Sequence, residues 1–162
     1  MRFQHFAMAA TFCSSALGKT ADPATNLAIR DVVNAFSFAV DTRPVPEFNS
    51  IFTQDAVLNL TIPGSQQTGI DNINKYLITL LTQFETQHSF GTQNVDVNAD
   101  GTGATAITSF IGSFWDVSHS PPLYAQFCQQ FNDTLVKTKG QWHISHKVVK
   151  FLTPSLGNLT LS

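Results

Sequence analysis

The chain has 162 residues, of which 43% are hydrophobic and only 12% are charged, and its formal net charge is -2 with a pI near 6.2. This length suits one domain, because a single core of this size buries most of its apolar surface. Lysine and arginine are scattered along the chain, so the sequence offers no basic patch for phosphates and argues against nucleic-acid binding.

The first 18 residues have the layout of a secretory signal peptide. Arg2 precedes an uncharged run from Phe6 to Leu17 that ends at Gly18. This run is shorter than the about 20 apolar residues that a membrane span needs, and no later run is long enough. We therefore expect a signal peptide at 1–18, a domain at 19–162, and localisation in the secretory pathway or outside the cell. An amphipathic first helix is the alternative.

Three Asn-x-Ser/Thr sequons, at Asn59, Asn132 and Asn158, agree with passage through a glycosylating compartment. Cys13 lies in the expected leader, so Cys128 is the one thiol of the mature chain and an internal disulfide is excluded. We expect Cys128 to be a small buried hydrophobic residue rather than a reactive or intermolecular thiol.

Two helical patterns precede the strand-rich part of the chain. Asp22 and Pro23 form a helix start signal, and apolar residues then recur at helical spacing to Val40, which predicts a helix over 23–40. A short helical stretch is expected at 46–52 and a strand at 55–62. From Gly69 to Phe84 the apolar residues trace one face of a second, longer helix.

Four strand-like runs follow, at 88–97, 104–115, 124–138 and 142–152. Asp100-Gly101 and Lys139-Gly140 punctuate them and are typical of hairpin turns. The late sheet is therefore expected to be antiparallel, with the helices packed against one of its faces, which is an α+β arrangement.

Several short motifs follow one another along the chain: Asp41 after the first helix, 52–57 entering the first strand, Gly69-Ile70, Thr86-Gln87-His88, the Asp100-Gly101 turn, and 140–144 at the start of the last strand. Their order and spacing resemble the SnoaL-like branch of the nuclear transport factor 2-like superfamily, in particular a secreted fungal-type member. The resemblance covers almost the whole mature chain. It implies a cone-shaped barrel, in which a strongly curved, mostly antiparallel sheet wraps around helices and leaves an internal apolar pocket.

The run from Thr86 to Gly91 is similar to the region of scytalone dehydratase that carries a catalytic histidine, and Asp41 falls where that family keeps an aspartate. The resemblance therefore implies His88 and Asp41 as catalytic residues. From the residues alone, a histidine on a strand or an aspartate at a helix end serves structure equally well. The two tyrosines, second histidine and asparagine of the dehydratase are replaced here by Val40, Leu60, Ser113 and Phe131, so the same dehydration is not implied.

Strand alternation predicts which other side chains face the pocket. A glycan on Asn132 would point that residue outward and turn its neighbours on the strand inward. In the last strand, strict alternation places His143, Ser145 and Lys147 on one face and Trp142, Ile144 and His146 on the other. The resemblance implies that the first face points toward the pocket. The expected substrate-binding residues are Leu60, Tyr76, Phe110, Ser113, Trp115, Gln129, Phe131, His143 and Lys147. Core packing of the aromatic residues, and solvation of His143 and Lys147 at a barrel rim, are the alternatives.

No metal and no cofactor are expected. His143 and His146 fall on opposite strand faces and no carboxylate cluster accompanies them. The sequence also has no nucleophile elbow, phosphate loop or dinucleotide fingerprint.

Two function classes remain open. The first is an enzyme of specialised metabolism that promotes cyclisation of a hydrophobic polyketide or terpenoid intermediate, including hetero-Diels-Alder cycloaddition, or its dehydration or isomerisation. The second is a non-catalytic secreted carrier of a small hydrophobic ligand. An interaction domain that dimerises through the outer sheet face is disfavoured by the sequon at Asn132, and homodimerisation is otherwise left open.

Overall fold

The structure, a computed structural model, describes residues 22–159. In that range the order is α1 (Pro23–Asp41), β1 (Phe52–Asn59), β2 (Gln67–Thr68), α2 (Ile70–Leu81), β3 (Glu85–Val97), β4 (Gly103–Asp116), β5 (Leu123–Thr138), β6 (Gln141–Phe151) and β7 (Leu156–Gly157). The strands form one sheet in the order β2-β1-β6-β5-β4-β3, and β7 adds to β5. Pairing is antiparallel except between β1 and β6. The predicted α+β fold is confirmed, but the curved sheet stays open and does not close into a barrel.

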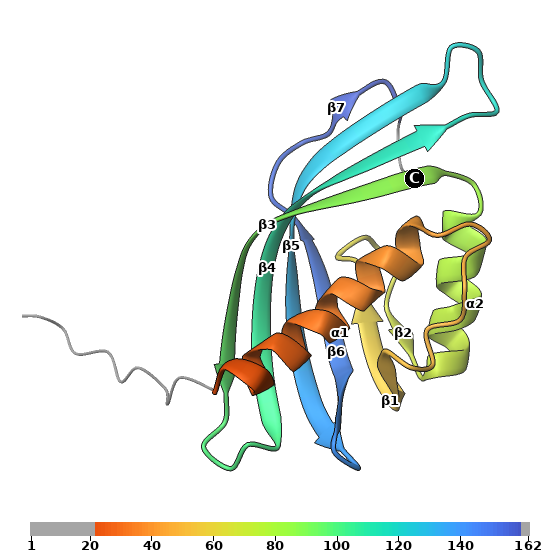
Figure 1. The fold of residues 1–162 in the computed structure, drawn as a ribbon. Coiled ribbons are helices and arrows are strands. Elements are labelled where there is room, and N and C mark those ends of the chain that lie inside the picture. Colours follow the sequence, from red (N-terminus) through yellow and green to blue (C-terminus); the bar gives the residue numbers. More distant parts are fainter. Residues whose placement is uncertain (1–21, 160–162) are drawn as a thin grey trace, which may run out of the picture.

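Helix α1 supplies much of the core. The Asp22 carboxylate accepts hydrogen bonds from the backbone N–H groups of the first turn, an N-cap worth about 1 kcal/mol. Ile29, Val33, Phe36 and Val40 recur at helical spacing and are at most 3% exposed. Burying each such side chain contributes about 1.5–3 kcal/mol. Figure 1 shows α1 running across the concave side of the sheet, where it contacts β3, β4 and β6.

The sheet is strongly bent, and the bend shapes the space beneath it. Figure 1 shows β3, β4 and β5 changing direction near their middle, so that their outer halves swing over α2. In β3 the register with β4 shifts between Phe90 and Gln93, which marks a β-bulge at residues 91–92. A bulge bends its strand and strengthens the local twist. The bulge begins three residues after His88, whose imidazole lines the cavity beneath the curved sheet.

A second irregularity corrects the predicted alternation of the last strand. The β5–β6 register skips Ser145, which is an extra residue on β6. The buried side chains are therefore Trp142 and Ile144 before this point, and Lys147 and Val149 after it. The prediction that alternate residues share one face along the whole of the last strand is wrong. The extra residue exchanges the inner and outer positions, so His143 and Lys147 lie on opposite faces.

Other differences concern element ends and short strands. The helical stretch expected at 46–52 is wrong: the structure has only a turn at 49–51, and β1 begins at Phe52. The second helix ends at Leu81, three residues before the predicted end. Both predicted hairpin turns are confirmed, with Gly101 and Gly140 at φ values of 71° and 84° that favour glycine.

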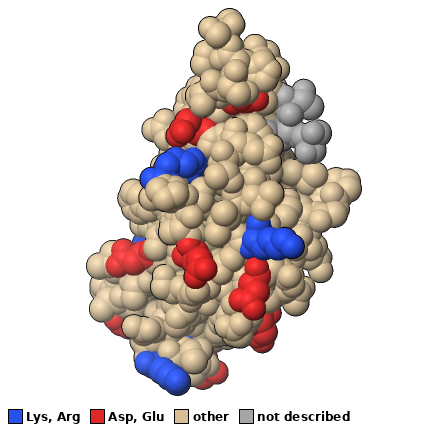
Figure 2. All heavy atoms as spheres, turned by 90° about the vertical axis from the view of Figure 1, so that its right-hand side faces the viewer, with Lys and Arg blue, Asp and Glu red and all other residues tan. Residues whose placement is uncertain are grey.

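The charged side chains are sparse on the face shown in Figure 2, where basic and acidic residues are interspersed among uncharged ones. Within 22–159, neither helix is long and apolar enough to cross a membrane. The predicted signal peptide lies outside the residues that the structure describes.

Candidate functional site

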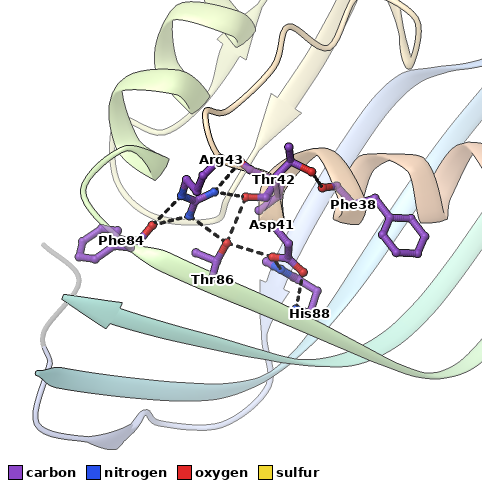
Figure 3. Close-up of polar contacts among 8 residues, drawn as sticks. Phe38, Asp41, Thr42, Arg43, Phe84, Thr86 and His88 are labelled. Carbon is purple, nitrogen blue, oxygen red and sulfur yellow. Dashed lines mark hydrogen bonds and ion pairs between the residues drawn. The ribbon is translucent and has the colours of Figure 1, made fainter. Parts of the chain in front are cut away.

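A histidine and an aspartate meet where α1 ends beside β3. The Nδ1 atom of His88 lies 2.7 Å from Oδ1 of Asp41, and the backbone N–H of His88 donates to Oδ2 of the same carboxylate at 2.8 Å. The side chains are 6% and 24% exposed, respectively. Asp41 is the last residue of α1 and His88 is on the inner face of β3, so the two motifs that the sequence analysis singled out are in contact (Figure 3).

Thr86 contacts the carboxylate and Arg43 contacts Thr86, and the sequence analysis assigned neither to the site. The Thr86 hydroxyl lies 2.9 Å from Oδ1 of Asp41. The Arg43 guanidinium donates to that hydroxyl at 3.2 Å, to the Val40 carbonyl at 2.7 Å and to the Phe84 carbonyl (Figure 3). Arg43 thereby ties the chain after α1 to the start of β3. A lone arginine after a helix carries no recognisable signal, whereas Thr86 lies in the quoted Thr86-Gln87-His88 motif.

The Asp41 carboxylate is kept ionised. Burial tends to raise its pKa, but the hydrogen bonds and charge of His88 and the Thr86 hydroxyl outweigh burial and hold the pKa below the ordinary 3.8. The ionised Asp41 accepts from the Nδ1–H of the His88 imidazole. This contact fixes the tautomer in which Nε2 carries the free lone pair.

His88 lines a cavity of about 440 Å³ between the curved sheet and α2. Most of its wall is apolar, with contributions from Val40, Leu77, Phe84 and Phe114. The His88 ring packs with Phe110 at 5.3 Å and with Phe131 at 6.4 Å between ring centroids. Nδ1 is bonded to Asp41, and Nε2 makes no hydrogen bond to any residue in 22–159. The arrangement can therefore accept a proton from a guest molecule in water-poor surroundings.

The predicted substrate-binding residues divide into two groups. Leu60, Tyr76, Gln129 and Phe131 line the cavity with His88, and Phe110 lies behind the imidazole. The remaining four, Ser113, Trp115, His143 and Lys147, do not line it.

Each of those four has another neighbour. Ser113 accepts a hydrogen bond from Gln126, and the Trp115 ring packs against that of Tyr124, with 5.4 Å between the ring centroids. The half-buried His143 lies on the face of β6 opposite its buried neighbours, because the bulge reverses the parity between it and Lys147.

Lys147 is fully buried in the core and forms an ion pair with Asp133. Its Nζ lies 2.8 and 3.0 Å from the two carboxylate oxygens, and 3.6 Å from the centroid of the Phe131 ring. Burial lowers the pKa of Lys147 and raises that of Asp133, in each case against the attraction of the partner. The Phe131 ring that contacts this amine also lines the cavity.

The remaining predicted positions lie away from the cavity. Asn132 is on the outer side of β5, whereas Asn59 and Asn158 lie at strand ends, where their Oδ1 atoms accept backbone hydrogen bonds. Cys128 is exposed, so the prediction that it is a buried hydrophobic residue is wrong: its side chain falls on the outer face of β5. Within 22–159, no three His, Cys, Asp or Glu side chains group as metal ligands would.

Solved structures with the same fold cover nearly the whole chain. A candidate scytalone dehydratase from Novosphingobium aromaticivorans is 23% identical, covers 86% of this chain and 93% of its own, and has a TM-score of 0.70. A candidate aromatic ring hydroxylase from the same species is 22% identical, covers 85% of this chain and 96% of its own, and has a TM-score of 0.73. The hexachlorocyclohexane dehydrochlorinase LinA-type3 from Novosphingobium barchaimii is 14% identical, covers 85% of this chain and 92% of its own, and has a TM-score of 0.71. At these identities the likeness shows the fold alone.

Sequence comparison supplies the family. No curated protein sequence matches the chain significantly. The family model of the SnoaL-like domain, however, matches residues 24–148, a segment that runs from the first turn of α1 into β6. Because this match spans most of its length, the chain belongs to the SnoaL-like domain family.

Proposed function

We propose that this protein is a cofactor-independent enzyme of the lyase type, in which His88 removes a proton from a small hydrophobic substrate. One observation carries the proposal: Asp41 occupies Nδ1 of an imidazole that lines an apolar cavity, so Nε2 is left as the base. A dehydratase and a dehydrochlorinase among the proteins of the same fold agree with elimination chemistry. The cavity of about 440 Å³ falls in the usual range for small-molecule sites, about 300–1,000 Å³.

The reaction follows from the positions of the two groups. Nε2 takes a proton from a C–H group of the substrate, and the C–H electron pair forms a new double bond as the leaving group departs with its own pair. In a dehydration the leaving hydroxide takes the proton back from His88 and becomes water. Asp41 does not touch the substrate. It is a positioning residue that keeps the lone pair on Nε2 and stabilises the imidazolium formed in the step.

The same proton abstraction also begins isomerisation and the cyclisation of a polyketide or terpenoid intermediate, which we include in the proposal. A hetero-Diels-Alder cycloaddition is supported less well. It uses the shape of the pocket but has no need of a base held by an ionised carboxylate. The dyad therefore favours proton transfer over a pericyclic reaction.

The base is tested with 5-nitrobenzisoxazole, a small aromatic probe whose ring opening needs only proton removal. The proton of its C–H group goes to Nε2, the C–H pair forms the nitrile, and the N–O bond breaks to release a coloured phenolate. We expect the wild-type protein to open the ring about 10²–10⁴-fold faster than His88→Gln, which keeps the size of the side chain but not the base.

The matched control is His146→Gln, on the exposed side of β6, which should react as the wild type does. Naphthalene should bind the wild type and His88→Gln with affinities within a few-fold of each other, as expected when a residue acts mainly in the transition state. Equal rates for wild type and His88→Gln, with naphthalene binding intact, would contradict the proposal and favour a carrier of hydrophobic ligands.

A further inference from the structure

The cavity wall includes a buried amide whose oxygen has no hydrogen-bond partner among residues 22–159. Gln129 lies on the inner face of β5, is 3% exposed and lines the cavity. Its Oε1 is fully buried and makes no hydrogen bond to any residue in 22–159. Leaving a buried amide unpaired destabilises a folded protein, so nearly all such groups are satisfied by some partner. A partner that enters from the cavity would satisfy this one.

The space that holds this amide exists because residue 112 is glycine. A Cβ built on Gly112 would lie 2.2 Å from Oε1 of Gln129, closer than real atoms approach. Gly112 is also the residue of β4 that pairs with His88 on β3. The amide and the imidazole therefore reach the cavity from opposite sides of one glycine.

Other polar groups of the cavity wall are already engaged. The Ser65 hydroxyl donates to the Ile62 carbonyl, and the Gln83 amide donates to the carbonyl of Thr79. Tyr76 remains, but it projects from α2 and is only half-buried. Gln129 is thus the buried polar group best placed to meet an oxygen atom of a guest next to His88.

We propose that the Gln129 amide is the polar anchor of the cavity, and that it selects apolar ring compounds that carry a hydroxyl or carbonyl oxygen. An amide can accept from a hydroxyl with Oε1 or donate to a carbonyl with its N–H groups, depending on which end faces the guest. The inference rests on the proposed function in one respect: an oxygen held by Gln129 places the neighbouring ring carbon beside the base. It adds to that function the class of substrate.

The test compares two probes that differ by one hydroxyl, 2-naphthol and naphthalene, and measures binding without turnover. In Gln129→Leu the affinity for 2-naphthol should fall about 5–10-fold while that for naphthalene is unchanged or rises, since a typical hydrogen bond has this value. The same variant should melt about 3–6 °C higher without ligand, because it removes an unpaired buried amide. This combination of gained stability and lost selectivity is not expected of a residue that only packs in the core.

Three controls make the outcome decisive. Gln130→Leu, next along β5 on its outer face, should retain both affinities. Gly112→Ala should reduce 2-naphthol binding as Gln129→Leu does, because the methyl group displaces the amide. In His88→Gln the preference for 2-naphthol should persist, so that a failure of the base and a failure of the anchor are told apart. If Gln129→Leu keeps the preference, or if Tyr76→Phe alone abolishes it, the proposal is overturned.

Discussion

Both oxygens of Asp41 are used, and this explains how a carboxylate can stay ionised at the edge of an apolar cavity. Oδ2 accepts the backbone N–H of His88, while Oδ1 receives the imidazole and the Thr86 hydroxyl. Hydrogen bonds to a charged acceptor are worth about 1.5–3 kcal/mol each, more than neutral ones. The carboxylate thus fixes both the backbone and the ring of His88.

Asp41→Asn tests this contact, because an amide cannot hold the imidazole as a carboxylate does. We expect the rate of 5-nitrobenzisoxazole opening to fall by about 10²-fold, with naphthalene binding retained, and stability to fall by about 1–3 kcal/mol. The wild-type pKa of Asp41 is lower in the folded chain than in the unfolded chain. Its stabilising contribution is therefore complete above the unfolded value of 3.8 and is lost as the pH falls through the folded value.

Urea unfolding of both proteins between pH 7 and pH 2.5 measures this effect. The stability difference between wild type and Asp41→Asn should be constant at neutral pH and shrink as the pH falls below 3.8 and through the lower folded pKa of Asp41. A difference that does not change with pH would mean that the carboxylate gives no ionisation-linked stability.

At the residue scale, the sequence predicted Asp41 and His88 but not the Arg43 contacts around them. The resemblance picked out Asp41 and His88, and these residues are in contact. Arg43 and Phe84, whose contacts complete the network, could not be foreseen, because a guanidinium that binds main-chain carbonyls leaves no pattern in a sequence. The catalytic role of the pair stays a prediction.

At the scale of the elements, the bulge between strands β5 and β6 determines where the Lys147 side chain lies. Without the extra residue at Ser145, strict alternation from the buried Trp142 would place Lys147 on the outer side of the sheet. The bulge turns it inward, where Asp133 receives it. A buried pair of this kind is held together by attraction in a low-dielectric interior but costs desolvation of both ions. The net effect of this ion pair on stability is therefore small, although Lys147 Nζ lies within hydrogen-bond distance of both Asp133 carboxylate oxygens.

Lys147→Met should destabilise the fold by about 3–5 kcal/mol, because it leaves Asp133 buried without its partner. The double variant Asp133→Val with Lys147→Met should be near neutral or more stable than the wild type by about 1–4 kcal/mol, since apolar side chains then fill the site. Urea denaturation measures both. Lys150→Met, on the exposed side of β6, is the control and should change stability by less than about 0.5 kcal/mol. Equal losses in the single and double variants would show that an unpaired Asp133 is not what destabilises Lys147→Met.

The same reasoning explains which elements the sequence could predict. The two helices and four long strands have many residues with one period, so their patterns are clear. Strands β2 and β7 have two residues each, too few for any period. The bulges at residues 91–92 and at Ser145 each add one residue to a regular strand pairing. The pattern of apolar residues around Ser145 does not indicate this extra residue. Long elements were thus predictable. Lys147 was predicted to face inward and does, but the bulge that separates its face from that of His143 was not predictable.

At the scale of the whole molecule, the convex side of the sheet exposes apolar side chains beside a sequon. Ile107 and Ile111 on β4 are 44% and 41% exposed. Ile107 pairs with Asn132, and Ile111 pairs with the exposed Cys128. Neighbouring exposed apolar residues favour association with another surface. We propose that the chain is secreted and glycosylated, and that a glycan on Asn132 covers this part of the sheet.

Asn132→Gln tests that arrangement in protein secreted from a glycosylating host. Loss of one glycan, seen as a fall in intact mass, should expose Ile107 and shift the protein toward dimers or larger species in light scattering. Asn158→Gln is the matched control, because it removes a glycan at the end of the chain without uncovering β4. A Cys128→Ser background keeps disulfide exchange out of the measurement. If Asn132→Gln loses its glycan and remains as monomeric as Asn158→Gln, then the glycan does not protect this face, because a hydrophobic surface that it covered would associate once bare.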